Sequence, residues 1–294
     1  MLEIFLLLEF LKNIFNNNYA NLNLNLNNSI KAISYEEFNE EKEKKEINID
    51  LTNISAKNIL VKEIKGQTLI EKNSQEIKPI ASLTKLITAV IALKNYSFDD
   101  EFIIKKEFLT NNDAEKNTKL REGEKFNLKE ILNIMLISSS NISAWTLADK
   151  MGNDKFLNLM INFVKDAGAL ETQVKEASGI SDDNRSSLND LFLIIQKILK
   201  EYPEIFEISI KPDYFIIKNG NNRLIYNTNY LLAEKKYRNI ILGSKTGFTS
   251  KAGECLILLV KYPTSPLIFI GLLDSRDRLK DAEYILEKLS RFYE

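Results

Sequence analysis

Apolar residues recur with a helical period through the middle of the chain and in strand-like runs toward both ends. The helical spacing predicts helices over residues 80–95, 128–136, 144–151, 154–167, 188–201 and 279–292. β-Branched and aromatic runs predict two strands within 55–71 around a glycine turn, and further strands from 214 onward, notably at 239–242, 254–261 and 267–273. Strands at both ends with helices between them predict an α+β fold. We expect an antiparallel sheet packed against helices, together with an all-helical subdomain.

The first 46 residues differ in composition from the rest of the chain. Residues 16–28 hold eight asparagines, and every residue of 40–46 is charged. Neither segment can bury a core, so we expect a flexible leader over 1–46 and a folded domain over 47–294. The apolar run 4–8 lacks a positively charged start and is followed by Glu9. An export signal and an amphipathic helix lying on a membrane both remain open.

Composition excludes several kinds of protein. Lys and Arg number 40 against 41 Asp and Glu, and the resulting net charge of -1 gives no general attraction to nucleic acid. The single cysteine, Cys255, excludes an internal disulfide and a multi-cysteine zinc site, and its apolar surroundings predict a buried, inert thiol. The chain has no histidine. Any proton acceptor for a nucleophilic serine must therefore be lysine, a carboxylate or water.

Ser82-Leu83-Thr84-Lys85 is the first of three polar strings that suggest chemistry. It stands at the start of an apolar helix, where Lys85 lies one turn after Ser82 on the same face. Burial among apolar residues lowers a lysine pKa, which would make a neutral amine available to take the serine proton. The backbone N–H of Ser82 would point to where an oxyanion forms. A serine cap followed by a surface lysine is the alternative interpretation.

The second string, Ser139-Ser140-Asn141, interrupts two apolar helical segments and would direct polar groups into an interior cleft. The similar Ser187-Leu188-Asn189 stands at a helix start, where capping explains it. The third string, Lys245-Thr246-Gly247, continues a predicted strand, followed by Phe248 and Thr249. Because Gly247 has no side chain, a substrate backbone can lie along this strand edge.

In this order the three strings resemble those of the serine-type D-alanyl-D-alanine carboxypeptidases, the low-molecular-weight penicillin-binding proteins. The resemblance extends from about residue 50 to the end of the chain. Segments similar to those of the family are 56–73, 80–86, 120–124, 178–184 and 227–229, and most specifically Lys245-Thr246-Gly247-Phe248-Thr249 followed by Ala252-Gly253.

The resemblance implies a β-lactamase/DD-peptidase-like fold with its active site in the cleft between the sheet and the helical subdomain. Ser82 would form an acyl-enzyme with a D-Ala-D-Ala peptide of peptidoglycan, Lys85 would be the base, and Asn141 would hold that lysine and a substrate carbonyl. Ser139, with Lys245 nearby, would protonate the leaving amine. The implied substrate-binding residues are Thr246, Gly247, Phe248 (through its backbone N–H), Thr249 and Arg276, the last with a surface ion pair to Asp274 or Asp277 as its alternative.

The same resemblance implies acylation by β-lactams, no metal or other cofactor, and an extracytoplasmic location set by the substrate. The chain ends with the last helix of the catalytic domain, so we expect no C-terminal β-domain. A DD-endopeptidase that cuts peptidoglycan crosslinks would use the same residues and stays open. A non-catalytic peptidoglycan-binding protein would not need this intact set. A class A β-lactamase would need Glu-x-x-Leu-Asn, which Glu176-Ala177-Ser178-Gly179-Ile180 does not match.

Overall fold

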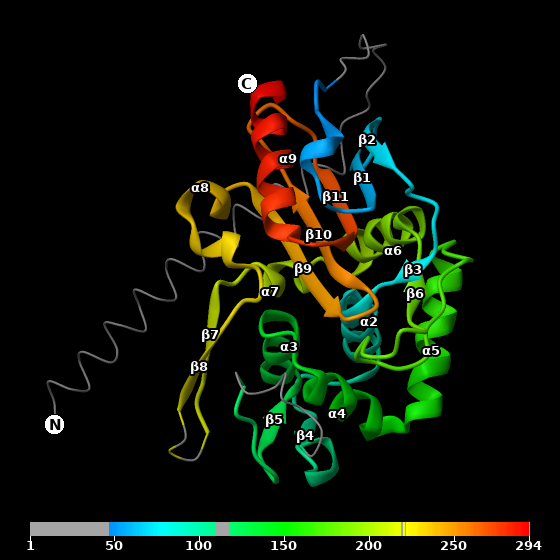
Figure 1. Cartoon of the computed structure of the whole chain (residues 1–294). Helices are drawn as coiled ribbons and strands as arrows, with labels where there is room; N and C mark the ends of the chain where they lie inside the picture. The colour runs from blue at the N-terminus through cyan, green and yellow to red at the C-terminus, as the bar shows by residue number, and fades with distance from the viewer. Residues whose placement is uncertain (1–46, 110–117, 219, 221, 294) are drawn as a thin grey trace, which may run out of the picture. The chain divides into compact units, whose positions relative to one another are not determined.

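The computed structural model describes residues 47–109, 118–218, 220 and 222–293 (Figure 1). The predicted leader, with its apolar run and its asparagine-rich and charged segments, lies outside the described residues. The division of the chain at residue 46 therefore stays a prediction. None of the helices in the described part of the chain is long and apolar enough to span a bilayer.

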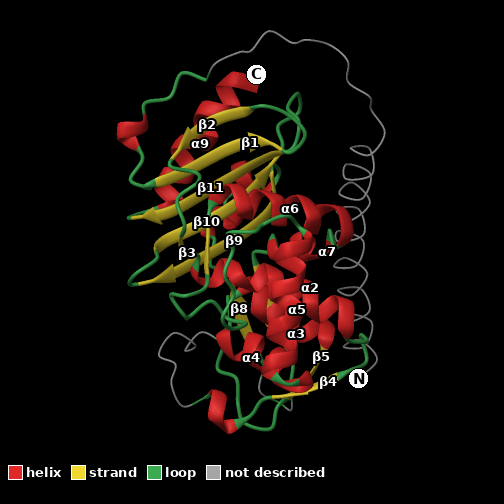
Figure 2. Cartoon of the chain, turned by 90° about the vertical axis from the view of Figure 1, so that its right-hand side faces the viewer, coloured by secondary structure: helices red, strands yellow, loops and turns green. Residues whose placement is uncertain are grey.

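Five antiparallel strands form the main sheet in the order β2-β1-β11-β10-β9 (Figure 2). They are β1 (Asn58–Glu63), β2 (Thr68–Lys72), β9 (Ile241–Thr249), β10 (Gly253–Val260) and β11 (Ile268–Ser275). Pairing of β1 with β11 joins the first hairpin to the last one. The predicted antiparallel sheet is confirmed, and β9 forms one of its edges.

The sheet is covered on both faces, which explains the nearly continuous apolar sequence of β10. Leu256 and Leu258 belong to the core beneath α9 (Arg278–Tyr293), together with Ile285 of that helix. The opposite face packs against α6 (Leu188–Glu201). A Cβ atom at Gly271 of β11 would lie 2.6 Å from the Leu188 side chain, so α6 sits directly on the strand.

Most of the remaining helices gather below β9 in the view of Figure 2. The central one is α2 (Lys85–Asn95), whose residues 85–92 are all buried. It contacts α3 (Leu128–Ile137), α4 (Asn141–Met151), α5 (Asn153–Asp166) and α7 (Glu204–Ser209). The predicted helical subdomain is thus present, built around a helix that is buried over residues 85–92.

Short elements complete the described residues. Three two-stranded ladders pair β3 (Lys78–Pro79) with β6 (Arg185–Ser186), β4 (Glu101–Ile103) with β5 (Lys125–Asn127), and β7 (Asp213–Ile216) with β8 (Arg223–Tyr226). One-turn helices are η1 (Leu51–Asn53), η2 (Ala81–Thr84), η3 (Lys106–Phe108), η5 (Tyr230–Ala233) and α8 (Lys235–Arg238).

Two helices begin several residues away from their predicted starts, and both differences fall at the polar strings. The helix predicted over 80–95 is divided, because Ala81 takes a left-handed φ of 46° and residues 81–84 form the 3-10 turn η2. The helix predicted over 144–151 begins at Asn141, because the Ser140 side chain caps it by accepting from the backbone N–H of Ser143 at 3.1 Å.

Candidate active site

The nucleophile candidate Ser82 lies on η2, which packs against the edge strand β9. Gly247 of β9 faces this turn. A Cβ atom at position 247 would lie 3.0 Å from both the backbone nitrogen of Ser82 and the Cβ of Ala81, so the strand approaches the serine only because residue 247 is glycine. The first and third strings, far apart in the sequence, therefore lie side by side.

Lys85 is completely buried, and its amine contacts three oxygen atoms. They are Ser82 Oγ at 2.8 Å, Asn141 Oδ1 at 2.6 Å and the backbone oxygen of Ser178 at 2.6 Å. The amide and peptide oxygens can only accept hydrogen bonds. In its neutral form the amine would donate its two hydrogens to them, and its lone pair would face the Ser82 hydroxyl. The site thus has the geometry for proton transfer from Ser82 to Lys85.

Ser139 lies in the break between α3 and α4, with a left-handed φ of 63°. Such a conformation is costly for serine and is common at functional sites. Lys245 Nζ of β9 donates to Ser139 Oγ at 2.8 Å and to the backbone oxygen of Thr246 at 2.8 Å. The second string therefore meets the third through a serine–lysine contact, as the prediction of an interior cleft requires.

Lys245 is buried, and its electrostatic surroundings favour the neutral amine. Desolvation, followed by the positive charges of Lys85 and Arg278, holds the pKa of Lys245 well below its ordinary value. Since the interaction between two charges is reciprocal, a positive charge on either lysine disfavours the charged form of the other.

The later Ser-x-Asn copy has the structural role expected for it. Ser187 is the N-cap of α6, and its hydroxyl accepts from the backbone N–H of Asp190 at 3.1 Å. Ser139-Ser140-Asn141 is therefore the copy that contributes to the cluster of serines and lysines.

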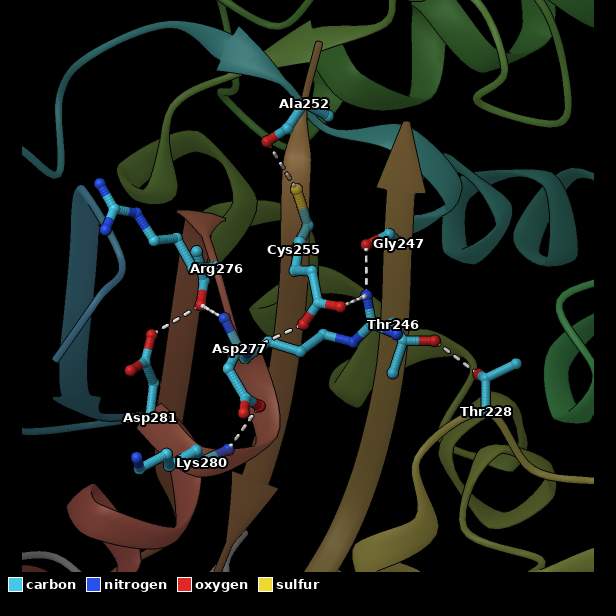
Figure 3. Close-up of polar contacts among 12 residues, drawn as sticks. Thr228, Thr246, Gly247, Ala252, Cys255, Arg276, Asp277, Lys280 and Asp281 are labelled. Atoms are coloured by element: carbon cyan, nitrogen blue, oxygen red, sulfur yellow. Dashed lines mark hydrogen bonds and ion pairs between the residues drawn. The ribbon is translucent and has the colours of Figure 1, made fainter. Parts of the chain in front are cut away.

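Thr246 and Thr249 lie on the third string with different partners. The Thr246 hydroxyl of β9 forms a hydrogen bond with the Thr228 hydroxyl (Figure 3). The Thr249 hydroxyl donates to Asp182 Oδ1 at 3.0 Å, which ties the end of β9 to the loop that carries Ser178. The Phe248 side chain is exposed.

The expectation for Arg276 requires correction. Its side chain is exposed and points away from Thr246 and Gly247 in Figure 3. Arg276 directly follows β11, which β10 separates from β9. Arg278, the first residue of α9, reaches β9 instead and donates from Nη1 to the backbone oxygen of Gly247 at 3.0 Å.

Ser178, Thr228 and Arg278 were not singled out as site residues by sequence reasoning. The segments around Ser178 and Thr228 carried a signal, because both belong to stretches that resemble the family. Ser178 contributes a backbone oxygen, which no side-chain motif reveals. No spacing in the sequence distinguishes Arg278 from Arg276.

Comparisons with known proteins agree with this geometry. A family model described as D-alanyl-D-alanine carboxypeptidase matches residues 38–275. A D-alanyl-D-alanine endopeptidase of Pseudomonas aeruginosa is 30% identical over 70% of this chain and 67% of its own length. A D-alanyl-D-alanine carboxypeptidase of Escherichia coli is 27% identical over 68% of this chain, which spans 51% of that relative.

Solved structures are similar over most of the chain. Penicillin-binding protein D2 of Listeria monocytogenes, solved in a cefotaxime-bound form, has 26% identity and a TM-score of 0.69, covering 82% of this chain and 98% of its own. The Streptomyces K15 DD-transpeptidase has 25% identity and a TM-score of 0.69, covering 80% and 97%. With its three strings joined by hydrogen bonds in one cluster and its family match over residues 38–275, the chain belongs to the D-alanyl-D-alanine carboxypeptidase family of serine peptidases.

Proposed function

We propose that this protein removes the terminal D-alanine from peptidoglycan stem peptides through an acyl-enzyme on Ser82. The observation that carries the proposal is the buried Lys85 amine, 2.8 Å from Ser82 Oγ and held by two oxygens that only accept. The same geometry supports acylation by β-lactams, since the Listeria relative was solved with cefotaxime bound. A peptidoglycan substrate places the protein outside the cytoplasm.

Acylation begins when Ser82 Oγ attacks the carbonyl carbon of the penultimate D-alanine and its proton passes to Lys85 Nζ. The carbonyl oxygen becomes an oxyanion, stabilised by the backbone N–H groups of Ser82 and Phe248. The carbon–nitrogen bond then breaks, and Ser139 delivers a proton to the departing amine. The proton that Lys85 took from Ser82 then passes to Ser139, so Lys85 is neutral again before deacylation. Lys245 holds the Ser139 hydroxyl in place by donating a hydrogen bond to Oγ at 2.8 Å.

Deacylation reverses the direction of proton transfer at Ser82. Water attacks the acyl carbon while Lys85 accepts its proton, and Ser82 Oγ leaves with a proton returned by the lysine. Thr246 and Thr249, with the positive charge of Arg278 behind β9, bind the terminal carboxylate of the substrate. Arg278 thus takes the role that sequence reasoning gave to Arg276.

A DD-endopeptidase that hydrolyses crosslinks is the second candidate. The Pseudomonas relative named an endopeptidase, at 30% identity, favours it. Its chemistry would use the same serine and lysine residues, since the scissile bond again follows a D-alanine. The two candidates differ only in the group that leaves.

Replacement of the nucleophile tests both candidates. We expect Ser82→Ala to abolish labelling by a fluorescent penicillin and all D-alanine release, with an unchanged circular dichroism spectrum. The wild-type protein should be offered a stem pentapeptide and a crosslinked muropeptide dimer in parallel, with products measured by mass spectrometry. Undiminished labelling of Ser82→Ala would overturn the assignment of the nucleophile, and cleavage of the dimer alone would select the endopeptidase.

A further inference from the structure

The loop over residues 176–184 lies against α2 beside the Lys85 amine. Its backbone binds α2 at two successive carbonyl groups. The oxygen of Ala177 accepts from Thr88 Oγ1 at 2.6 Å, and the oxygen of Ser178 accepts from Lys85 Nζ at 2.6 Å. The orientation of the Ser178 carbonyl therefore decides one of the three contacts of the Lys85 amine.

The Glu176 side chain accepts hydrogen bonds from several N–H groups of this loop. Its carboxylate accepts from the backbone N–H of Ser178 at 2.6 Å, from that of Gly179 at 2.5 Å and from Asn184 Nδ2 at 2.6 Å. The indole N–H of Trp145 donates to it at 3.3 Å. Every one of these partners is an N–H donor, so they suit an ionised carboxylate, which only accepts hydrogen bonds.

One peptide unit connects Glu176 to Lys85. The peptide between Ser178 and Gly179 directs its carbonyl oxygen to Lys85 and its N–H to Glu176. Because a trans peptide is planar, with its C=O and N–H pointing in opposite directions, fixing the N–H end also fixes the carbonyl end. A charged acceptor on the N–H polarises the unit and strengthens the carbonyl as an acceptor.

We infer that Glu176 is a positioning residue for the reaction, which orients the Lys85 amine through the Ser178–Gly179 peptide. The inference rests on the proposed function, in which Lys85 is the base for Ser82. Glu176 touches neither substrate nor the reacting atoms. Its carboxylate lies one peptide unit away from the Lys85 amine.

Charges on other elements also bear on the lysine pair. Lys85 and Arg278 both act on Lys245, and Asp182 lies at the far end of the loop, on Thr249. The buried side chains of α3, α4, α5 and α7, the helices packed against α2, are all uncharged. Removal of the Glu176 charge should therefore have a visible effect on the titration of the lysine pair.

The experiment measures second-order acylation by a fluorescent penicillin as a function of pH in full-length protein. In Glu176→Gln we expect the plateau rate to fall about tenfold or more, as for loss of a charge-assisted hydrogen bond. The rising limb of the plot of acylation rate against pH should also move to lower pH, because the neutral Lys85 amine forms more easily once the negative charge of Glu176 is gone. Glu176→Asp keeps the charge and should keep the limb at the wild-type pH with a reduced plateau.

Asp190→Asn is the matched control. Asp190 is a buried carboxylate, whereas Glu176 is half-buried. Asp190 accepts from the backbone N–H of Glu171 at 2.9 Å and from Thr172 Oγ1 at 2.8 Å, with no contact to Lys85. It should lower the melting temperature and leave the pH limb unchanged. A folded Glu176→Gln with the wild-type limb would overturn the inference, and so would a Glu176→Asp limb displaced like that of Glu176→Gln. Failure of wild-type labelling, by contrast, would overturn the proposed function itself.

Discussion

At the scale of single residues, the chemistry depends on burying two lysines in one site. Lys85 and Lys245 are both buried, in a chain without histidine. An ammonium group loses its hydration on burial, and each lysine adds its charge to the field felt by the other. The pair therefore supplies the neutral amine at a lower pH than an exposed lysine, whose ordinary pKa is about 10.4.

The rate of acylation should rise with pH along one limb whose apparent pKa lies below that of free lysine. The direction follows from the lowered pKa of Lys245 and its coupling to Lys85, since the reactive form is the one that has lost a proton. Rapid-mixing measurements with a chromogenic β-lactam would give the profile. Lys85→Arg keeps the positive charge but supplies no neutral base, so it should lose nearly all acylation. Acylation by Lys85→Arg at the wild-type rate would exclude Lys85 as the base.

At the scale of elements, the site depends on backbone approaches that only glycine permits. Gly179 has a φ of 82°, and a Cβ atom there would lie 1.9 Å from the backbone oxygen of Ala81, immediately before the nucleophile. The loop over 176–184 and the turn η2 are thus in direct backbone contact. The loop must keep this position for the Ser178 oxygen to remain on Lys85.

Gly179→Ala should therefore displace the loop and abolish penicillin labelling. Gly168→Ala is its matched control, because Gly168 has a similar φ of 79° but its nearest neighbour lies 3.8 Å from an added Cβ. Both variants carry the left-handed strain of about 1–2 kcal/mol, which thermal melting would measure. Only Gly179→Ala should lose labelling, and equal labelling of the two variants would show that the close approach is unimportant.

At the scale of the whole molecule, the fold places the nucleophile between the sheet and the helical subdomain. Class A β-lactamases add to such a fold a glutamate that activates the deacylating water. Glu176 lies in the loop beside Lys85 here, but its carboxylate binds the loop's own N–H groups. An acyl-enzyme formed with penicillin would therefore lack a carboxylate base of this kind.

Penicillin should accordingly act as an inhibitor: it should acylate Ser82 once, and the resulting acyl-enzyme should be hydrolysed slowly. Intact-protein mass spectrometry should show a long-lived adduct on a peptide containing Ser82. Stopped-flow hydrolysis of a chromogenic cephalosporin should show a burst close to one equivalent of enzyme and then little turnover. Fast multiple turnover would favour a β-lactamase.

The sequence by itself determined the elements and most of the chemistry. Local periodicity is a property of neighbouring residues, so it predicted the sheet strands, the helical middle and the capping role of Ser187. The three strings named Ser82, Lys85, Ser139, Asn141 and Lys245, because reactive side chains are visible in a sequence. In the structure, hydrogen bonds join these five residues in one cluster.

Tertiary structure alone decided the contacts made by backbone atoms and by residues whose reach depends on strand order. The Ser178 oxygen binds Lys85 because the loop over 176–184 lies on α2, and a peptide oxygen has no sequence signature. β10 lies between β11 and β9, so a side chain at the end of β11 is one strand away from Gly247. Arg278, in the first turn of α9, extends across β10 and reaches the Gly247 oxygen, whereas Arg276 does not. Both facts follow from three-dimensional packing, which brings together residues that local pattern cannot relate.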